Sequence, residues 1–209
     1  MKFCEFEAFI LDMDGTLIDT GKYHSRAFAD AVLAQSGYAL TPGEHIEFFA
    51  THSMPFAETL NDRYGLSLDP QEVLAQKRLR MEEIFVAELF EGAHEFLERW
   101  RGEKPMALAT NSPLSFARPT LEKAGLMEYF DCITTADEVV NRKPNPEIFK
   151  ITFQKLGVDP QKTLVFEDQL IGIEAARAAG AHVVAVDNGQ PVEFPPDIFV
   201  ATWKGFLQA

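Results

Sequence analysis

The chain has 209 residues, 46% of them hydrophobic and 24% charged, which is enough apolar material for a core that needs neither disulfides nor structural metals. Its formal net charge of −13 argues against nucleic acid and anionic membranes as main partners. Nothing near Met1 resembles a signal peptide and no stretch reaches the roughly 20 apolar residues of a membrane span, so we expect a cytoplasmic protein with no membrane partner.

The N-terminal part is predicted to contain one strand followed by a long helical region. Residues 6–11 form a short apolar run that is typical of a buried strand, and this run leads into a turn at residues 14–16. Residues 20–90 are expected to be almost entirely helical, with a first helix over residues 23–35. Prolines mark the starts of three more helices, at Pro42, Pro55 and Pro70.

From Gly92 onward, strands alternate with helices. The predicted strands cover residues 106–110, 132–134, 163–166, 182–186 and 198–200. Helices are expected around residues 120–124, 146–156 and 171–179. Strands separated by helices of this length imply right-handed crossovers and a parallel sheet. We therefore predict a doubly wound, Rossmann-like α/β core formed by residues 1–18 and 91–209, with an α-helical cap domain, residues 19–90, inserted after its first strand.

Polar side chains gather at the carboxyl ends of three predicted strands and in one loop. The strand ends carry Asp12, Asp14, Thr110, Asn111, Glu167 and Asp168, and the loop carries Lys143. In open parallel sheets, ligands bind at the carboxyl ends of the strands. Each short motif alone is more often an ordinary turn, cap or strand end, but all of them in this order indicate one functional site.

The residue types at this edge of the sheet suit a metal ion and a phosphate group. Asp12 and Asp14 can surround one cavity where the chain turns, and Asp168 adds a third carboxylate from another strand. Mg²⁺ is a hard cation that binds a few carboxylates alongside substrate oxygens. Lys143 can neutralise carboxylate and phosphate charge, and Thr110 can donate a hydrogen bond to a phosphate oxygen.

These motifs resemble those of the haloacid dehalogenase-like hydrolase superfamily. The resemblance covers nearly the whole chain and is carried by residues 12–20, 110–112, 142–149, 166–168 and 172–180. The inserted helices are similar to the cap in the branch that contains sugar-phosphate phosphatases and β-phosphoglucomutase. The four motifs in order are specific for the superfamily, and much less specific for a substrate.

The resemblance implies a two-step phosphoryl transfer. Asp12 attacks phosphorus and forms an aspartyl-phosphate, while Asp14 acts first as general acid and then as general base. Mg²⁺ is expected to be held by Asp12, by the backbone carbonyl of Asp14 and by Asp168. Thr110 and Lys143 are expected to hold phosphate oxygens, and Lys143 also orients Asp12.

Further site residues follow from the same resemblance. Gly15 permits the tight turn and, with Thr16 and Asn111, is expected to line the substrate site. Glu167 is either a metal ligand through water or a partner of Lys143, and we favour the second role. His24 is the cap residue expected to approach the leaving-group oxygen, although a half-exposed helical histidine fits the same pattern.

The predicted activity is hydrolysis of small phosphate monoesters, sugar phosphates first among them, by a monomeric enzyme. Dehalogenases of the superfamily do not require Mg²⁺ or an acid–base aspartate such as Asp14, so their reaction is disfavoured. One departure from the branch pattern is Gln169, which stands where serine is common. The substrate itself cannot be read from motif spacing, because the shape of the cap selects it.

Two alternative functions stay open. A β-phosphoglucomutase-like mutase needs to grip a second phosphate, commonly with an arginine in the loop before the third cap helix, and residues 50–56 contain no arginine. A non-catalytic phospho-sensor, similar to a receiver domain, would share the aspartates, Mg²⁺ and the lysine. Asp14 and a cap of about seventy residues disfavour the sensor.

Overall fold

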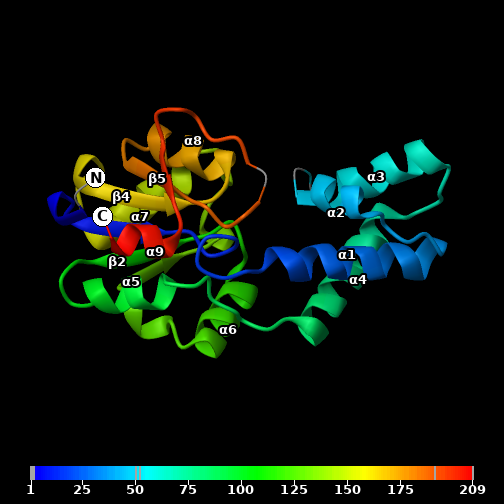
Figure 1. The fold of residues 1–209 in the computed structure, drawn as a ribbon, viewed down its shortest axis with the longest axis horizontal. Helices are drawn as coiled ribbons and strands as arrows, with labels where there is room; N and C mark the ends of the chain where they lie inside the picture. Colours follow the sequence, from blue (N-terminus) through cyan, green and yellow to red (C-terminus); the bar gives the residue numbers. More distant parts are fainter. Residues whose placement is uncertain (1–2, 50, 52, 191, 209) are drawn as a thin grey trace. The chain divides into compact units, whose positions relative to one another are not determined.

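The computed structural model describes residues 3–49, 51, 53–190 and 192–208. The chain forms two compact units (Figure 1). One unit consists of Met1–Asp19 and Ala87–Ala209, and the other of Thr20–Val86. We call the first the core unit and the second the helical unit.

Within the described residues, the core unit is built on a six-stranded parallel sheet in the order β3-β2-β1-β4-β5-β6. The strands are β1 Ala8–Leu11, β2 Met106–Ala109, β3 Cys132–Thr134, β4 Thr163–Glu167, β5 His182–Val186 and β6 Phe199–Ala201. The predicted α/β fold with a parallel sheet is confirmed. The first strand begins at Ala8, two residues later than predicted, and the exposed Glu7 before it forms an ion pair with Lys162 at 2.7 Å.

Helices cover both faces of this sheet. They are α5 Ala93–Trp100, α6 Leu114–Ala124, α7 Glu147–Leu156, α8 Leu170–Ala178 and α9 Trp203–Leu207, with the short 3₁₀ segments η1 Phe3–Glu5, η2 Met127–Tyr129, η3 Ala136–Glu138 and η4 Pro160–Lys162. Side chains of α7 and α8 pack against one face of the sheet. Side chains of α5 and α9 pack against Phe166 on the other face. The sequence pattern predicted neither α5 nor α9.

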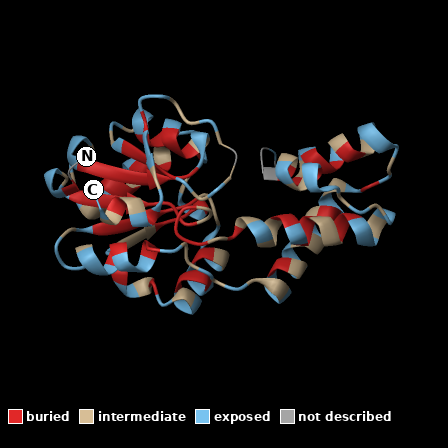
Figure 2. Cartoon of the chain, viewed as in Figure 1, coloured by how far each residue is buried: buried red, intermediate tan, exposed pale blue. Residues whose placement is uncertain are grey.

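Alternation along the central strands divides the core into two layers, because successive side chains of a strand point to opposite faces. Ile10 and Val165 lie in the cluster that packs against α7 and α8. Phe9 and Phe166 point to the other face, where Phe166 stacks on Trp203 with ring centroids 5.2 Å apart. Figure 2 shows the strands as an almost continuous buried layer. The carboxyl ends of these buried strands are therefore rigidly placed.

The helical unit has its own apolar centre. Its helices are α1 Gly21–Ser36, α2 Pro42–Phe49, α3 Ser53–Tyr64 and α4 Pro70–Ile84. Phe28 stacks on Phe48 with centroids 4.6 Å apart, and Phe56 lies beside both. Asp69 caps α4 by accepting hydrogen bonds from the first turn, so Pro70 opens the helix as predicted. Helix α4 ends at Ile84, so residues 85–90, which were predicted to be helical, are not. In the segment 50–56, residues 50 and 52 lie outside the described residues.

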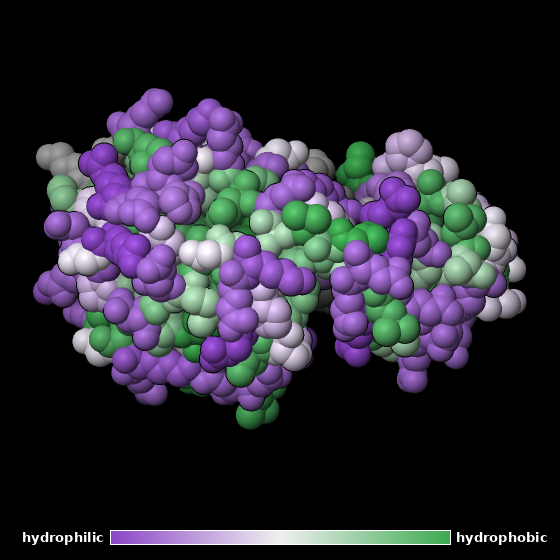
Figure 3. Space-filling model, turned by 90° about the horizontal axis from the view of Figure 1, so that it is seen from below, coloured by the Kyte–Doolittle hydropathy of each residue, from purple (hydrophilic) through white to green (hydrophobic). Residues whose placement is uncertain are grey.

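The surfaces of both units are mainly hydrophilic in the view of Figure 3. Large exposed hydrophobic side chains, such as Leu79 and Val140, are spread along the chain. Among the described helices, none is long and apolar enough to cross a membrane.

Candidate active site

The site begins where β1 ends. Asp12 is only 6% exposed, and its backbone N–H donates to the carbonyl of Phe166 in β4 at 3.0 Å, so it continues the sheet ladder. The chain then turns sharply, because the carbonyl of Met13 accepts hydrogen bonds from the N–H groups of both Leu17 and Ile18 at 3.0 Å. The turn spans residues 12–18.

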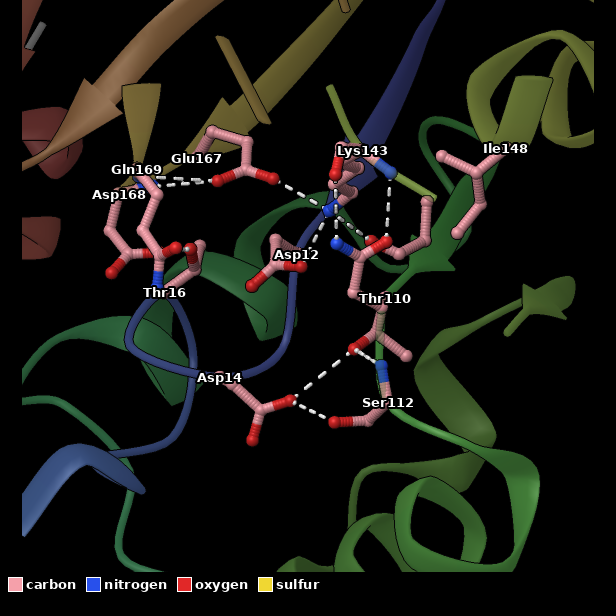
Figure 4. Close-up of polar contacts among 12 residues, drawn as sticks. Asp12, Asp14, Thr16, Thr110, Ser112, Lys143, Ile148, Glu167, Asp168 and Gln169 are labelled. Carbon is pink, nitrogen blue, oxygen red and sulfur yellow. Dashed lines mark hydrogen bonds and ion pairs between the residues drawn. The ribbon is translucent and has the colours of Figure 1, made fainter. Parts of the chain in front are cut away.

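Lys143 joins two carboxylates of the site (Figure 4). Its Nζ donates to Oδ1 of Asp12 at 2.6 Å, to Oε1 of Glu167 at 2.6 Å and to the carbonyl of Ala109 at 2.8 Å. The Lys143 side chain is 3% exposed, and three acceptors match the three donors of an ammonium group. Burial lowers the pKa of Lys143, but Asp12 and Glu167 more than offset this and hold the pKa above its ordinary value. The lysine therefore stays charged.

Glu167 is held entirely by protein donors. Its Oε1 binds Lys143, and its Oε2 accepts the backbone N–H groups of Asp168 at 3.1 Å and of Gln169 at 3.3 Å. A Cβ added to Gly172 would lie 1.9 Å from Cδ of Glu167, so only glycine leaves room for this carboxylate against α8. These contacts favour a role for Glu167 in holding Lys143 and the start of α8 over direct metal binding.

Asp168 is fixed through both of its carboxylate oxygens. The hydroxyl of Thr16 donates to Oδ1 at 2.8 Å, and the amide of Asn188 donates to Oδ2 at 3.0 Å. Gly15 has φ +81°, and a Cβ there would lie 2.2 Å from Oδ2 of Asp168. Gly15 is thus required both by its backbone conformation and by the close approach of Asp168. The hydroxyl of Thr16 contacts Asp168, and its expected role in lining the substrate site stays a prediction.

The acidic side chains form a group that could hold a divalent metal ion. Asp12, Glu167 and Asp168 each offer an oxygen, and these atoms lie within 4.8 Å of one another. Burial raises the pKa of Asp12 well above its ordinary value, against the opposing effect of Lys143. Burial, followed by the charge of Glu167, raises the pKa of Asp168 to about 8. Lys143 alone does not balance these carboxylates, so a bound cation would fit the charge and the hard oxygen donors of the group.

Asp14 lies apart from this acidic group, facing the end of β2 (Figure 4). Its Oδ2 accepts hydrogen bonds from the hydroxyl of Ser112 at 2.7 Å and of Thr110 at 3.3 Å. Its Oδ1 is buried and has no hydrogen-bond partner among the described residues. A buried oxygen of this kind can exchange a proton with a bound molecule. Thr110 thus helps to hold Asp14, and its contact with phosphate stays a prediction.

The remaining predicted residues divide between the two units. Asn111 accepts the backbone N–H of Lys143 through Oδ1 at 3.1 Å, so it positions the lysine loop. His24 is half-buried in the first turn of α1, in the helical unit. The core unit thus gathers every predicted site residue except His24, and its contacts place each within a network reaching Asp12, Asp14 or Asp168.

Three residues of this network were not predicted as site residues. Ser112 ends the motif that begins at Thr110, and a hydroxyl next to two polar residues was an available signal. Asn188 follows the carboxyl end of β5, the same position that marked the other site residues. Trp203 donates from its indole Nε1 to the carbonyl of Thr16 at 2.7 Å, and nothing in its local sequence indicates this contact.

Comparisons with known proteins agree with the geometry. A family model described as haloacid dehalogenase-like hydrolase matches residues 6–180. The fructose-1-phosphate phosphatase YqaB of Escherichia coli is 33% identical, over 87% of this chain and 96% of that protein. A phosphorylated carbohydrates phosphatase of Thermotoga maritima is 33% identical, over 83% of this chain and 82% of its own length. A Thermotoga maritima structure described provisionally as a β-phosphoglucomutase superposes with a TM-score of 0.78 at 27% identity, covering 97% of both chains.

Proposed function

Because this chain belongs to the haloacid dehalogenase-like hydrolases, we propose that it is a Mg²⁺-dependent phosphatase that hydrolyses small phosphate monoesters, sugar phosphates above all. The observation that carries this proposal is the buried Asp12, held by Lys143 at 2.6 Å beside Asp168 and on the same loop as Asp14. The names of the two phosphatase relatives support sugar phosphates as the substrate class.

In the first step, a carboxylate oxygen of Asp12 attacks phosphorus. Lys143 binds Oδ1 of Asp12, so we assign the attack to Oδ2. The new bond joins Oδ2 to phosphorus, the bond between phosphorus and the ester oxygen breaks, and Asp14 gives its proton to the departing oxygen. Ser112 and Thr110 hold Asp14 through its Oδ2, which leaves Oδ1 to face that oxygen.

In the second step, water attacks the phosphorus of the aspartyl-phosphate. Asp14, now a carboxylate, takes a proton from the water, and the bond between phosphorus and Oδ2 of Asp12 breaks. Inorganic phosphate and the free carboxylate of Asp12 result, so the enzyme returns to its starting state. Asp14 serves as acid in the first step and as base in the second, so it ends the cycle with the proton it began with.

Asp12, Asp168 and the backbone carbonyl of Asp14 would hold Mg²⁺, which supplies charge compensation between an anionic carboxylate and an anionic phosphate. Glu167 would act through Lys143. The helical unit, Thr20–Val86, would be the cap that contacts the leaving group, with His24 as one contact. The monomeric state and the cytoplasmic location stay predictions.

We expect the affinity for Mg²⁺ to fall as the pH is lowered below about 8. Asp168 has a pKa raised to about 8 in the metal-free protein, so at lower pH the ion must displace a proton. The same raised pKa means that Asp168 costs stability as pH rises through that value, and bound Mg²⁺ removes this cost. Calorimetric titrations with Mg²⁺ between about pH 6 and pH 9 measure the effect. An affinity independent of pH across this range would contradict it.

The proposed function is tested by incubating the protein with a panel of hexose, pentose and two-carbon phosphate monoesters, with Mg²⁺ and with a chelator. We expect steady release of inorganic phosphate that requires Mg²⁺, fastest with sugar phosphates. A mutase would instead interconvert hexose 1- and 6-phosphates, when primed with a bisphosphate, with little phosphate release. No release from any ester, together with such interconversion, would replace the phosphatase assignment.

A further inference from the structure

Asn188 connects two segments of the site that are far apart in the chain. It lies two residues beyond the end of β5. Its Nδ2 donates to the backbone carbonyl of Gly15 at 2.8 Å and to Oδ2 of Asp168 at 3.0 Å. An amide nitrogen carries two hydrogens, so both are used in these contacts.

The orientation of this amide is fixed from its other end. The backbone N–H of Gln190 donates to Oδ1 of Asn188 at 3.0 Å. If the amide were turned over, its oxygen would face the carbonyl of Gly15 and the carboxylate of Asp168, and its nitrogen would face an N–H donor. The structure therefore allows only the orientation in which Asn188 donates to the site.

We propose that Asn188 is a positioning residue that sets the affinity of the site for Mg²⁺. The inference rests on the proposed function, in which Asp168 and the carbonyl of Asp14 are metal ligands. Asn188 holds Asp168 directly, and it holds Asp14 through the carbonyl of the next residue, Gly15. One side chain thus fixes the spacing between two ligand-bearing segments.

The contact of Thr16 with the other oxygen of Asp168 shows why Asn188 is needed. Thr16 anchors Oδ1 at 2.8 Å, and a carboxylate held at one oxygen can still rotate about that contact. Asn188 anchors Oδ2 and removes this freedom. Partners that orient a ligating side chain typically change metal affinity by about 10- to 100-fold when they are replaced.

The test is a calorimetric titration of Mg²⁺ into the full-length protein and into Asn188→Ala. We expect the dissociation constant for Mg²⁺ to rise about tenfold. The Mg²⁺ concentration that gives half-maximal phosphate release should rise by the same factor, while kcat at saturating Mg²⁺ stays within about threefold of the wild type. Asn188→Ser keeps one donor in place of two, so its dissociation constant for Mg²⁺ should lie between those of the wild type and the alanine variant.

The matched control is Asp187→Ala. Asp187 is exposed and caps the same turn, where its Oδ1 accepts from the N–H of Gly189 at 3.0 Å. We expect Mg²⁺ affinity within about twofold of the wild type for this variant. Unchanged affinity in Asn188→Ala, an equal loss in Asp187→Ala, or a wild type that binds no Mg²⁺ would overturn the inference. Failure of the phosphatase proposal shows separately, as Mg²⁺ binding without phosphate release.

Discussion

Replacing Asp12 by asparagine is expected to reduce Mg²⁺-dependent phosphate release by roughly 10⁴-fold or more. The amide is not a nucleophile, so the first step cannot form the bond to phosphorus. The fold should persist. Burial raises the pKa of Asp12, which means that the charged carboxylate is costly to bury, and a neutral side chain of the same shape removes this cost. Phosphate release and far-ultraviolet circular dichroism measure the two effects.

A loss of metal binding in Asp12→Asn would also lower activity, so a second measurement isolates the covalent role. The wild-type protein is mixed with its best substrate, quenched in acid and digested, and the masses of its peptides are measured by mass spectrometry. The peptide containing Asp12 should gain the mass of one phosphoryl group, and the same peptide from Asp12→Asn should not. Phosphorylation at another residue, or activity retained in the variant, would contradict the assignment of Asp12.

Much of the fold is encoded in patterns that a single sequence displays. The runs at residues 8–11 and 164–166 are apolar and buried because helices cover both sides of the sheet, and such runs indicate a parallel arrangement. α9 was missed because five residues complete little more than one turn, too few for a periodic pattern. α5 was missed although Ala93, Phe96 and Leu97 have helical spacing, since two turns give a weak signal.

The site was predictable where a residue stands at the end of a strand, as Asp12 does, or in a motif that resembles the family's, as Lys143 does. Asp12 and Lys143 are 131 residues apart, yet both were assigned, and they meet at 2.6 Å. The choice of partner was less predictable. The hydroxyl of Thr110 also contacts Asp14, and this contact depends on tertiary placement, which motif spacing does not contain. Asn188 was missed because its contacts depend on where the loop after β5 returns to the sheet.

Replacing Lys143 by methionine is expected to lower the free energy of unfolding of the metal-free protein by about 3–5 kcal/mol at neutral pH. Methionine fills similar space, but it leaves Asp12 and Glu167 buried without a cation. Phosphate release should also fall, since Asp12 loses the contact that orients it. Denaturant-induced unfolding measures the stability. Lys155→Met is the matched control: Lys155 pairs with Glu138 at 2.5 Å but is 30% exposed, so its loss should cost about 1 kcal/mol or less.

The stability deficit of Lys143→Met should depend on pH in a defined direction. Without the lysine, the pKa of Asp12 rises further above its value in the unfolded chain. A carboxyl whose pKa is raised on folding contributes its stability at low pH and loses it as the pH rises through the folded pKa. The free energy of unfolding of the variant should therefore be closer to that of the wild type near pH 5 than near pH 8. A deficit of equal size at both values, or one matched by Lys155→Met, would mean that Lys143 stabilises the fold by packing alone. The buried charge pairs would then not be what orients Asp12.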